Sequence, residues 1–220
     1  MLGWEEALGS HDNDARDYWF HVDRPRTGAT IVDVGAGIGT DIPTFSKAVG
    51  PHGRVLAIEA HPDTFLALQK TCEYNRLANV TCVQAAVMDR SGTVFIEDTS
   101  AHETNSVRSE RSAAHGFSVR GSTLDALCAE HGIDQIDLLK MNIEGAEHLA
   151  IRGMSEVICR TRYAIIACHD FRSERGDSGS FSTRDEVVSF LRDRGFDIRT
   201  RDADPRAFVR DHIHGIRAGL

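Results

Sequence analysis

Three glycines that alternate with other residues are the first chemically informative feature of the chain. Gly35, Gly37 and Gly39 follow a run of strand-forming residues, and a helix is expected to begin near residue 42. A strand, a glycine turn and a helix start form a cradle for a nucleoside cofactor, because glycine lets the backbone approach a ligand closely. A dinucleotide loop requires G-x-G-x-x-G, but the sixth place counted from Gly35 is Thr40. The spacing therefore argues against a dinucleotide; another nucleoside cofactor, or a tight turn without a ligand, remains.

A carboxylate further along the chain supplies a second part of such a cradle. Residues 54–59 predict a short buried strand that ends in Glu59. An acid at this position can accept hydrogen bonds from both ribose hydroxyls of an adenosine, whichever adenosine cofactor is bound. Ala85 and Ala86 follow a third predicted strand and leave a slot for a flat adenine ring. The alternatives are a solvated carboxylate at a strand end and a strand that simply ends in alanines.

The glycine spacing resembles the first motif of S-adenosylmethionine-dependent methyltransferases. This resemblance implies S-adenosylmethionine as the cofactor, with its methionine end against the glycine turn. We expect contacts from the turn, the carboxylate, the alanine pair and the segment near residue 142. The predicted cofactor-binding residues are Asp33, Gly35, Ala36, Gly37, Gly39, Thr40, Asp41, Glu59, Ala60, Ala85, Ala86 and Asn142.

A second motif, IDLLKMNIEGAE, occupies residues 136–147. Together with VDVGAGIG at residues 32–39 and STLDAL at residues 122–127, it resembles the FkbM-type family of methyltransferases. The resemblance covers roughly residues 30–170. It implies the class I fold and methyl transfer, usually to an oxygen of a sugar or secondary metabolite. The acceptor varies within the family, so the resemblance does not identify it.

The chain departs from the family motif at Asn142, which stands where the family has an aspartate. An amide keeps its hydrogen-bonding capacity but cannot accept a proton as a base. It also weakens any Mg²⁺ site, because hard cations favour charged oxygen ligands. Three explanations stay open: a different acceptor, a base located elsewhere, or a lost activity. We expect no metal ion at this site.

His169 is the candidate for a base located elsewhere. It follows a hydrophobic strand expected near residues 162–168, at the sheet edge where ligands of open α/β folds bind. A histidine can take a proton from a hydroxyl as the methyl group arrives, and Asp170 or Glu144 can orient its ring. We therefore predict His169, Asn142 and Glu144 as the catalytic residues. A histidine that only caps the strand end is the alternative.

The elements that position these residues follow an alternating pattern of strands and helices. The pattern predicts one α/β domain: a seven-stranded, mostly parallel Rossmann-like sheet with helices on both faces. Strands are expected near residues 30–34, 54–59, 80–84, 136–142 and 162–168, with two more in 196–199 and 207–216, one of them reversed. Helices are expected near residues 41–49, 62–77, 123–131, 145–152 and 183–194. Two polar segments, 98–115 and 172–180, are either lids over an acceptor or plain surface.

Residues 1–28 are expected to form an N-terminal cap with a helix over residues 10–22, and residues 29–220 the core. The cap carries an aromatic cluster, Tyr18, Trp19 and Phe20. Core packing of the covering helix and stacking on an acceptor or cofactor are the two interpretations of this cluster.

Composition limits the partners of the chain. A formal net charge of −8 over 220 residues argues against a nucleic-acid-binding protein and favours a small-molecule methyl acceptor. The five cysteines include no C-x-x-C pair, so neither a disulfide framework nor a zinc site is indicated. No membrane span or signal peptide is apparent, which predicts a cytoplasmic protein. A homo-oligomer remains an option.

Three rival functions follow from the same residues. A small-molecule N-methyltransferase would tolerate Asn142, because an amine needs less help from a base. A protein that binds S-adenosylmethionine without transferring its methyl group also fits the asparagine. A nicotinamide-dependent oxidoreductase would use the same turn and Glu59, but the glycine spacing speaks against it.

Overall fold

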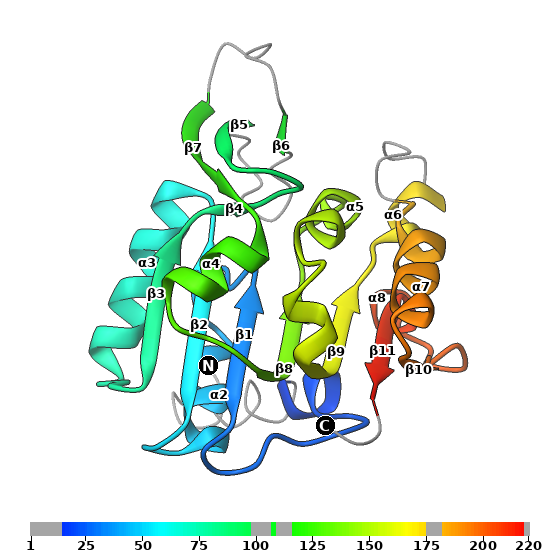
Figure 1. The fold of residues 1–220 in the computed structure, drawn as a ribbon, viewed down its shortest axis with the longest axis horizontal. Helices are drawn as coiled ribbons and strands as arrows, with labels where there is room; N and C mark the ends of the chain where they lie inside the picture. The colour runs from blue at the N-terminus through cyan, green and yellow to red at the C-terminus, as the bar shows by residue number, and fades with distance from the viewer. Residues whose placement is uncertain (1–14, 98–106, 109–115, 175–181, 218–220) are drawn as a thin grey trace, which may run out of the picture.

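A seven-stranded sheet forms the centre of the molecule (Figure 1). The structure, a computed structural model, describes residues 15–97, 107–108, 116–174 and 182–217. The strand order is β10-β11-β9-β8-β1-β2-β3, which confirms the predicted seven-stranded, mostly parallel sheet. Within the described residues, no helix is long and apolar enough to cross a membrane.

Five parallel strands carry the candidate site. They are β1 (Thr30–Val34), β2 (Arg54–Glu59), β3 (Val80–Gln84), β8 (Ile136–Met141) and β9 (Thr161–Ala167). Strand β11 (His212–Ile216) runs antiparallel to both β9 and β10 (Asp197–Arg199), so the reversed strand is β11. Because the five parallel strands point the same way, their carboxyl ends meet at one edge of the sheet.

Alternating side chains of the strands pack into two separate apolar cores. On β1, Val32 and Val34 join the core beneath helices α4 (Leu124–Glu130), α5 (Glu147–Ala150) and α7 (Arg184–Asp193). Ile31 joins the opposite core, which is covered by α2 (Ile42–Val49), α3 (Pro62–Tyr74) and the helical residues 15–19. The sheet therefore has helices on both faces, as predicted.

A second, four-stranded sheet stands beyond the carboxyl ends of β2 and β3 and was not expected (Figure 1). It contains β4 (Ala86–Val87), β5 (Gly92–Glu97), β6 (Val107–Arg108) and β7 (Gly116–Ser122) in the order β4-β7-β5-β6. Only β6 falls within the first predicted lid, residues 98–115. Apart from residues 107–108 and 172–174, both predicted lid segments lie outside the described residues.

The last predicted strand, over residues 207–216, is wrong in its first half. Residues Ala207–Arg210 form helix α8 and only His212–Ile216 form β11. The carboxylate of Asp204 accepts a hydrogen bond from the backbone N–H of Arg206 at 3.0 Å, which makes a turn just before the helix.

The predicted helix near 145–152 is also interrupted, because α5 gives way to a 3₁₀ turn over Ile151–Gly153. Helix α6 (Asp170–Glu174) follows β9 directly.

Candidate active site

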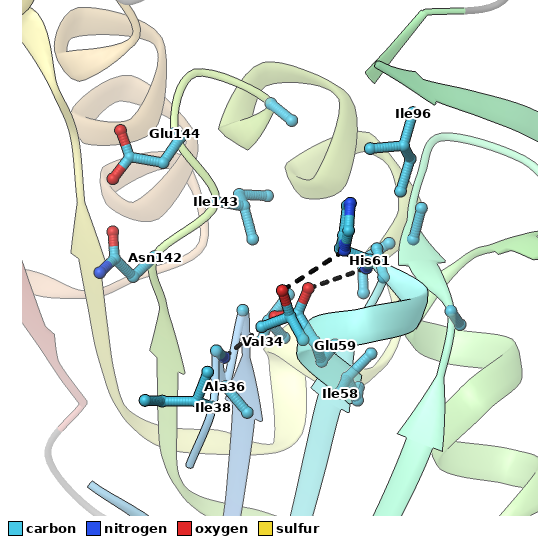
Figure 2. A pocket seen from close by; sticks show the side chains of 18 of the residues that line it. Val34, Ala36, Ile38, Ile58, Glu59, His61, Ile96, Asn142, Ile143 and Glu144 are labelled. Atoms are coloured by element: carbon cyan, nitrogen blue, oxygen red, sulfur yellow. Dashed lines mark hydrogen bonds between the residues drawn. The ribbon is translucent and has the colours of Figure 1, made fainter. Parts of the chain in front are cut away.

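A cavity of about 720 Å³ opens at the carboxyl ends of β1, β2 and β8 (Figure 2). Its volume is in the range of small-molecule sites. Ile96 of β5 and Val87 of β4 line it too, so the second sheet forms part of its wall. The predicted site residues that line it are Gly35, Ala36, Gly37, Thr40, Asp41, Glu59, Ala60, Ala85, Ala86, Asn142 and Glu144.

The glycine turn requires glycine at its first position. Gly35 has a φ of +77°, and a Cβ atom there would clash with the backbone carbonyl oxygen of Asn142. The N–H of Asn142 in turn donates to the carbonyl oxygen of Val34 at 2.9 Å. The ends of β1 and β8 therefore meet backbone to backbone, which brings the two sequence motifs into one site.

Glu59 is held between the glycine turn and the start of α3. Its Oε2 accepts from the N–H of Gly37 at 2.9 Å and its Oε1 from the N–H of His61 at 2.8 Å, as the dashed lines in Figure 2 show. Each carboxylate oxygen has a second lone pair. The side chain is thus fixed while both oxygens can still accept a hydrogen bond from a ligand in the cavity.

Two of the residues predicted to bind the cofactor, Asp33 and Gly39, do not line the cavity. Asp33 is fully buried, with its Oδ1 2.7 Å from Nζ of Lys140. Burial raises the pKa of Asp33 to about 6, against the opposing effect of the Lys140 ammonium. At Gly39, a side chain would meet Leu68 of α3. Asp33 supports the turn through Lys140, and Gly39 lets the turn pack closely against α3.

Lys140 was not predicted as part of the site, although it lines the cavity. Its Nζ donates to the carbonyl oxygen of Gly35 at 2.8 Å and pairs with Asp33 on the neighbouring strand. A lysine inside a buried strand is rarely tolerated unless it is paired. The lysine within the strand IDLLKM was therefore the available signal. His61, Asp63 and Ile143 are further lining residues that the sequence did not indicate.

Asn142 and Glu144 lie on the side of the pocket opposite Ile96 (Figure 2). The Oδ1 atom of Asn142 is buried and has no hydrogen-bond partner among the described residues. Glu144 adopts a φ of +53°, which is uncommon for a residue with a side chain. Its Oε1 lies 3.0 Å from Nε2 of His169, and its Oε2 accepts from Nη1 of Arg172 at 2.8 Å.

The charges around Glu144 keep it ionised. Burial raises the pKa of its carboxyl group, but His169 and Arg172 together lower it by more than burial raises it. The pKa therefore lies below its usual value. Both oxygens face cationic partners, so a metal ion at Glu144 would have to compete with His169 and Arg172. Within the described part of the chain, no group of three or more His, Cys, Asp or Glu side chains is arranged to hold a metal.

His169 lies behind Glu144 and does not line the cavity. Its Nδ1 is 3.8 Å from Oε1 of the buried Glu147, and the residue itself is 7% exposed. Burial lowers the pKa of His169, but Glu144 and Glu147 raise it to about 9. The imidazole is therefore protonated at neutral pH. A protonated imidazole has no lone pair free to take a proton, so these contacts favour a role for His169 beside Glu144 over the general-base role expected from the sequence.

Comparison with known sequences finds a matching family model and related proteins. The sequence model of the family described as "Methyltransferase FkbM domain" matches residues 33–198. The chain is 27% identical over 149 residues to 2-O-methyltransferase NoeI of Sinorhizobium fredii, covering 60% of each protein. It is also 27% identical over 234 aligned residues to the 31-O-demethyl-FK506 methyltransferase FkbM of Streptomyces tacrolimicus, covering 92% of this chain and 85% of that protein.

Solved structures show the same fold. The methyltransferase FkbM of Methylobacillus flagellatus superposes with a TM-score of 0.57 at 17% identity, covering 87% of this chain and 44% of that chain. Fibrillarin of Aeropyrum pernix, solved with natively bound S-adenosyl-L-methionine, superposes with a TM-score of 0.54 at 16% identity, covering 94% of this chain and 75% of that chain. The present chain thus spans less than two thirds of the Sinorhizobium and Methylobacillus proteins.

Proposed function

The chain belongs to the FkbM-type family of S-adenosylmethionine-dependent methyltransferases, and we propose that it methylates a hydroxyl group of a small molecule. The cofactor supplies a methyl group already activated by a sulfonium. Much of the rate of such a displacement comes from holding the two reactants in line and in contact. The task of the protein is therefore to bind both molecules in one cavity and to receive a proton.

The cavity offers a fitting set of groups for the cofactor. Glu59 has free lone pairs for the ribose hydroxyls, and Ala85 with Ala86 leaves room for the adenine ring. A Cβ atom at Gly37 would meet no protein atom within 4 Å, so the turn leaves open space on the side where the methionine end would lie. These residues fit an adenosine that carries an amino-acid chain.

The observation that carries the choice of a hydroxyl acceptor is the pair Asn142 and Glu144. Both line the cavity, and the buried Oδ1 of Asn142 has no hydrogen-bond partner among the described residues. Each Glu144 oxygen keeps a second lone pair beside its contact with His169 or Arg172. A hydroxyl group can donate to either of them, and a hydroxyl needs a proton acceptor during methylation more than an amine does. The names of the two relatives also place their methyl groups on oxygen atoms. An acidic acceptor would instead place its own negative charge against the Glu144 carboxylate.

Glu144 is our candidate for the proton acceptor. As the new C–O bond forms, the hydroxyl oxygen becomes positively charged and its proton becomes strongly acidic. An ionised carboxylate can then take that proton even though its own pKa is low. Asn142 would orient the hydroxyl, while His169 and Arg172 hold Glu144 in place. The methyl group passes from sulfur to oxygen and the proton passes to Glu144.

The test is a screen for transfer of a labelled methyl group from S-adenosylmethionine to polyhydroxylated and amine-bearing small molecules. We expect labelled products from hydroxyl acceptors. With such an acceptor, Glu144→Gln should lower the rate by about 10²–10³-fold without weakening the affinity for S-adenosylhomocysteine. Glu130→Gln, at the exposed end of α4, is the matched control and should leave the rate unchanged. Labelling of amines alone, unaffected by Glu144→Gln, would contradict the proposal.

A further inference from the structure

Trp19 lies outside the part of the chain that matches the family model, yet it contacts Asp41, a residue that lines the cavity. The family match begins at residue 33 and ends at residue 198. Trp19 precedes it and His212 follows it, yet their rings stack with centroids 4.9 Å apart and planes inclined by 19°. Trp19 is 4% exposed. Residues that precede and follow the family-matched region therefore pack against each other.

The indole N–H of Trp19 donates to Oδ2 of Asp41 at 2.9 Å. Asp41 lines the cavity and occupies the N-cap position of α2. An aspartate at this position commonly accepts hydrogen bonds from the first N–H groups of its own helix. The Asp41 side chain makes no such capping bond. Its carboxylate is instead bound by the indole.

The same indole also contacts the other end of the glycine turn. Nζ of Lys140 lies 5.1 Å from the centre of a Trp19 ring, which is a cation–π arrangement. That ammonium also donates to the carbonyl oxygen of Gly35 at 2.8 Å. Trp19 thus contacts Asp41 directly and Gly35 through Lys140. The turn is held at its first glycine and at the N-cap residue of α2.

We propose that Trp19 is a positioning residue that directs the Asp41 carboxylate toward the ammonium group of the cofactor's methionine end. This inference rests on the proposed function, because it requires S-adenosylmethionine in the cavity. Only one Asp41 oxygen is used by Trp19, so the carboxylate can still attract a cation. The family-matched segment alone lacks the group that orients this carboxylate.

Two ligands separate this role from general support of the fold. S-adenosylhomocysteine carries the amino-acid ammonium, whereas 5′-methylthioadenosine has the same adenosine without it. Trp19→Phe keeps an aromatic ring but removes the N–H donor. We expect this variant to bind S-adenosylhomocysteine about tenfold more weakly and 5′-methylthioadenosine as the wild type does. Tyr18→Phe, which changes the adjacent aromatic residue, is the control and should leave both affinities unchanged.

Asp41→Asn completes the test, and it stands on its own if Trp19→Phe does not fold. It should weaken S-adenosylhomocysteine selectively, and the double variant should bind no more weakly than Asp41→Asn alone. Equal weakening of both ligands, additive effects of the two substitutions, or unchanged binding by Trp19→Phe would each overturn the proposed role. A wild-type protein that binds neither ligand would instead contradict the proposed function itself.

Discussion

The charge of His169 leads to a quantitative prediction about stability. Glu144 and Glu147 raise its pKa from 6.5 to about 9, although burial alone would lower it. A difference of this size between the folded and unfolded states is worth about 3 kcal/mol. Because the pKa is higher in the folded protein, this stabilisation is complete below pH 6.5 and is lost as the pH rises through about 9. His169→Gln removes the titration.

Urea unfolding of both proteins across a pH series measures the effect. The quantity to compare is the free energy of unfolding of the wild type minus that of His169→Gln. This difference should be up to about 3 kcal/mol larger in neutral than in strongly alkaline solution. Groups that titrate in both proteins cancel in this difference. His52→Gln, in an exposed turn, should show no such pH dependence. A difference between wild type and His169→Gln that does not change with pH would refute the assigned charge.

Three further predictions concern the site. Gly35→Ala should prevent folding or cost more than about 3 kcal/mol in a thermal or urea melt, whereas a near-wild-type melt would contradict the close contact with Asn142. Lys140→Met should destabilise the protein by about 3–5 kcal/mol, because it leaves the buried Asp33 unpaired. Additional replacement of Asp33 by Leu should restore part of this stability in urea melts. No recovery in the double variant would count against the ion pair. Methyl transfer should persist in EDTA, because Glu144 is already bound by cationic side chains; activity lost in EDTA and restored by Mg²⁺ would show that the site holds a metal.

The main sheet and the glycine turn could be predicted because their signals are local. Buried strands such as residues 54–59 are apolar runs, and the turn after β1 is marked by glycines. The second sheet gave no such signal. β4 and β6 have two residues each, and β5 and β7 pair across a long intervening segment. Pairing between distant strands depends on contacts that no short window of sequence contains.

The chemistry of the site was less predictable than its location. The sequence placed His169 near Glu144 because both follow neighbouring parallel strands. It did not reveal Glu147 on the other side of the ring, and two carboxylates rather than one raise the pKa. Similarly, Trp19 precedes β1 in the sequence and Asp41 follows it. Their contact depends on where the helical residues 15–19 pack. Such properties follow from tertiary neighbours.

Calorimetric titration with S-adenosylhomocysteine and with NADH tests the central claim most directly. We predict that the wild type binds S-adenosylhomocysteine and not NADH. Glu59→Ala should lose about 2–4 kcal/mol of binding free energy, because two hydrogen bonds to the ribose are removed. Glu73→Ala, on the exposed part of α3, is the control and should bind as the wild type does. A protein that binds NADH and ignores S-adenosylhomocysteine would contradict the account.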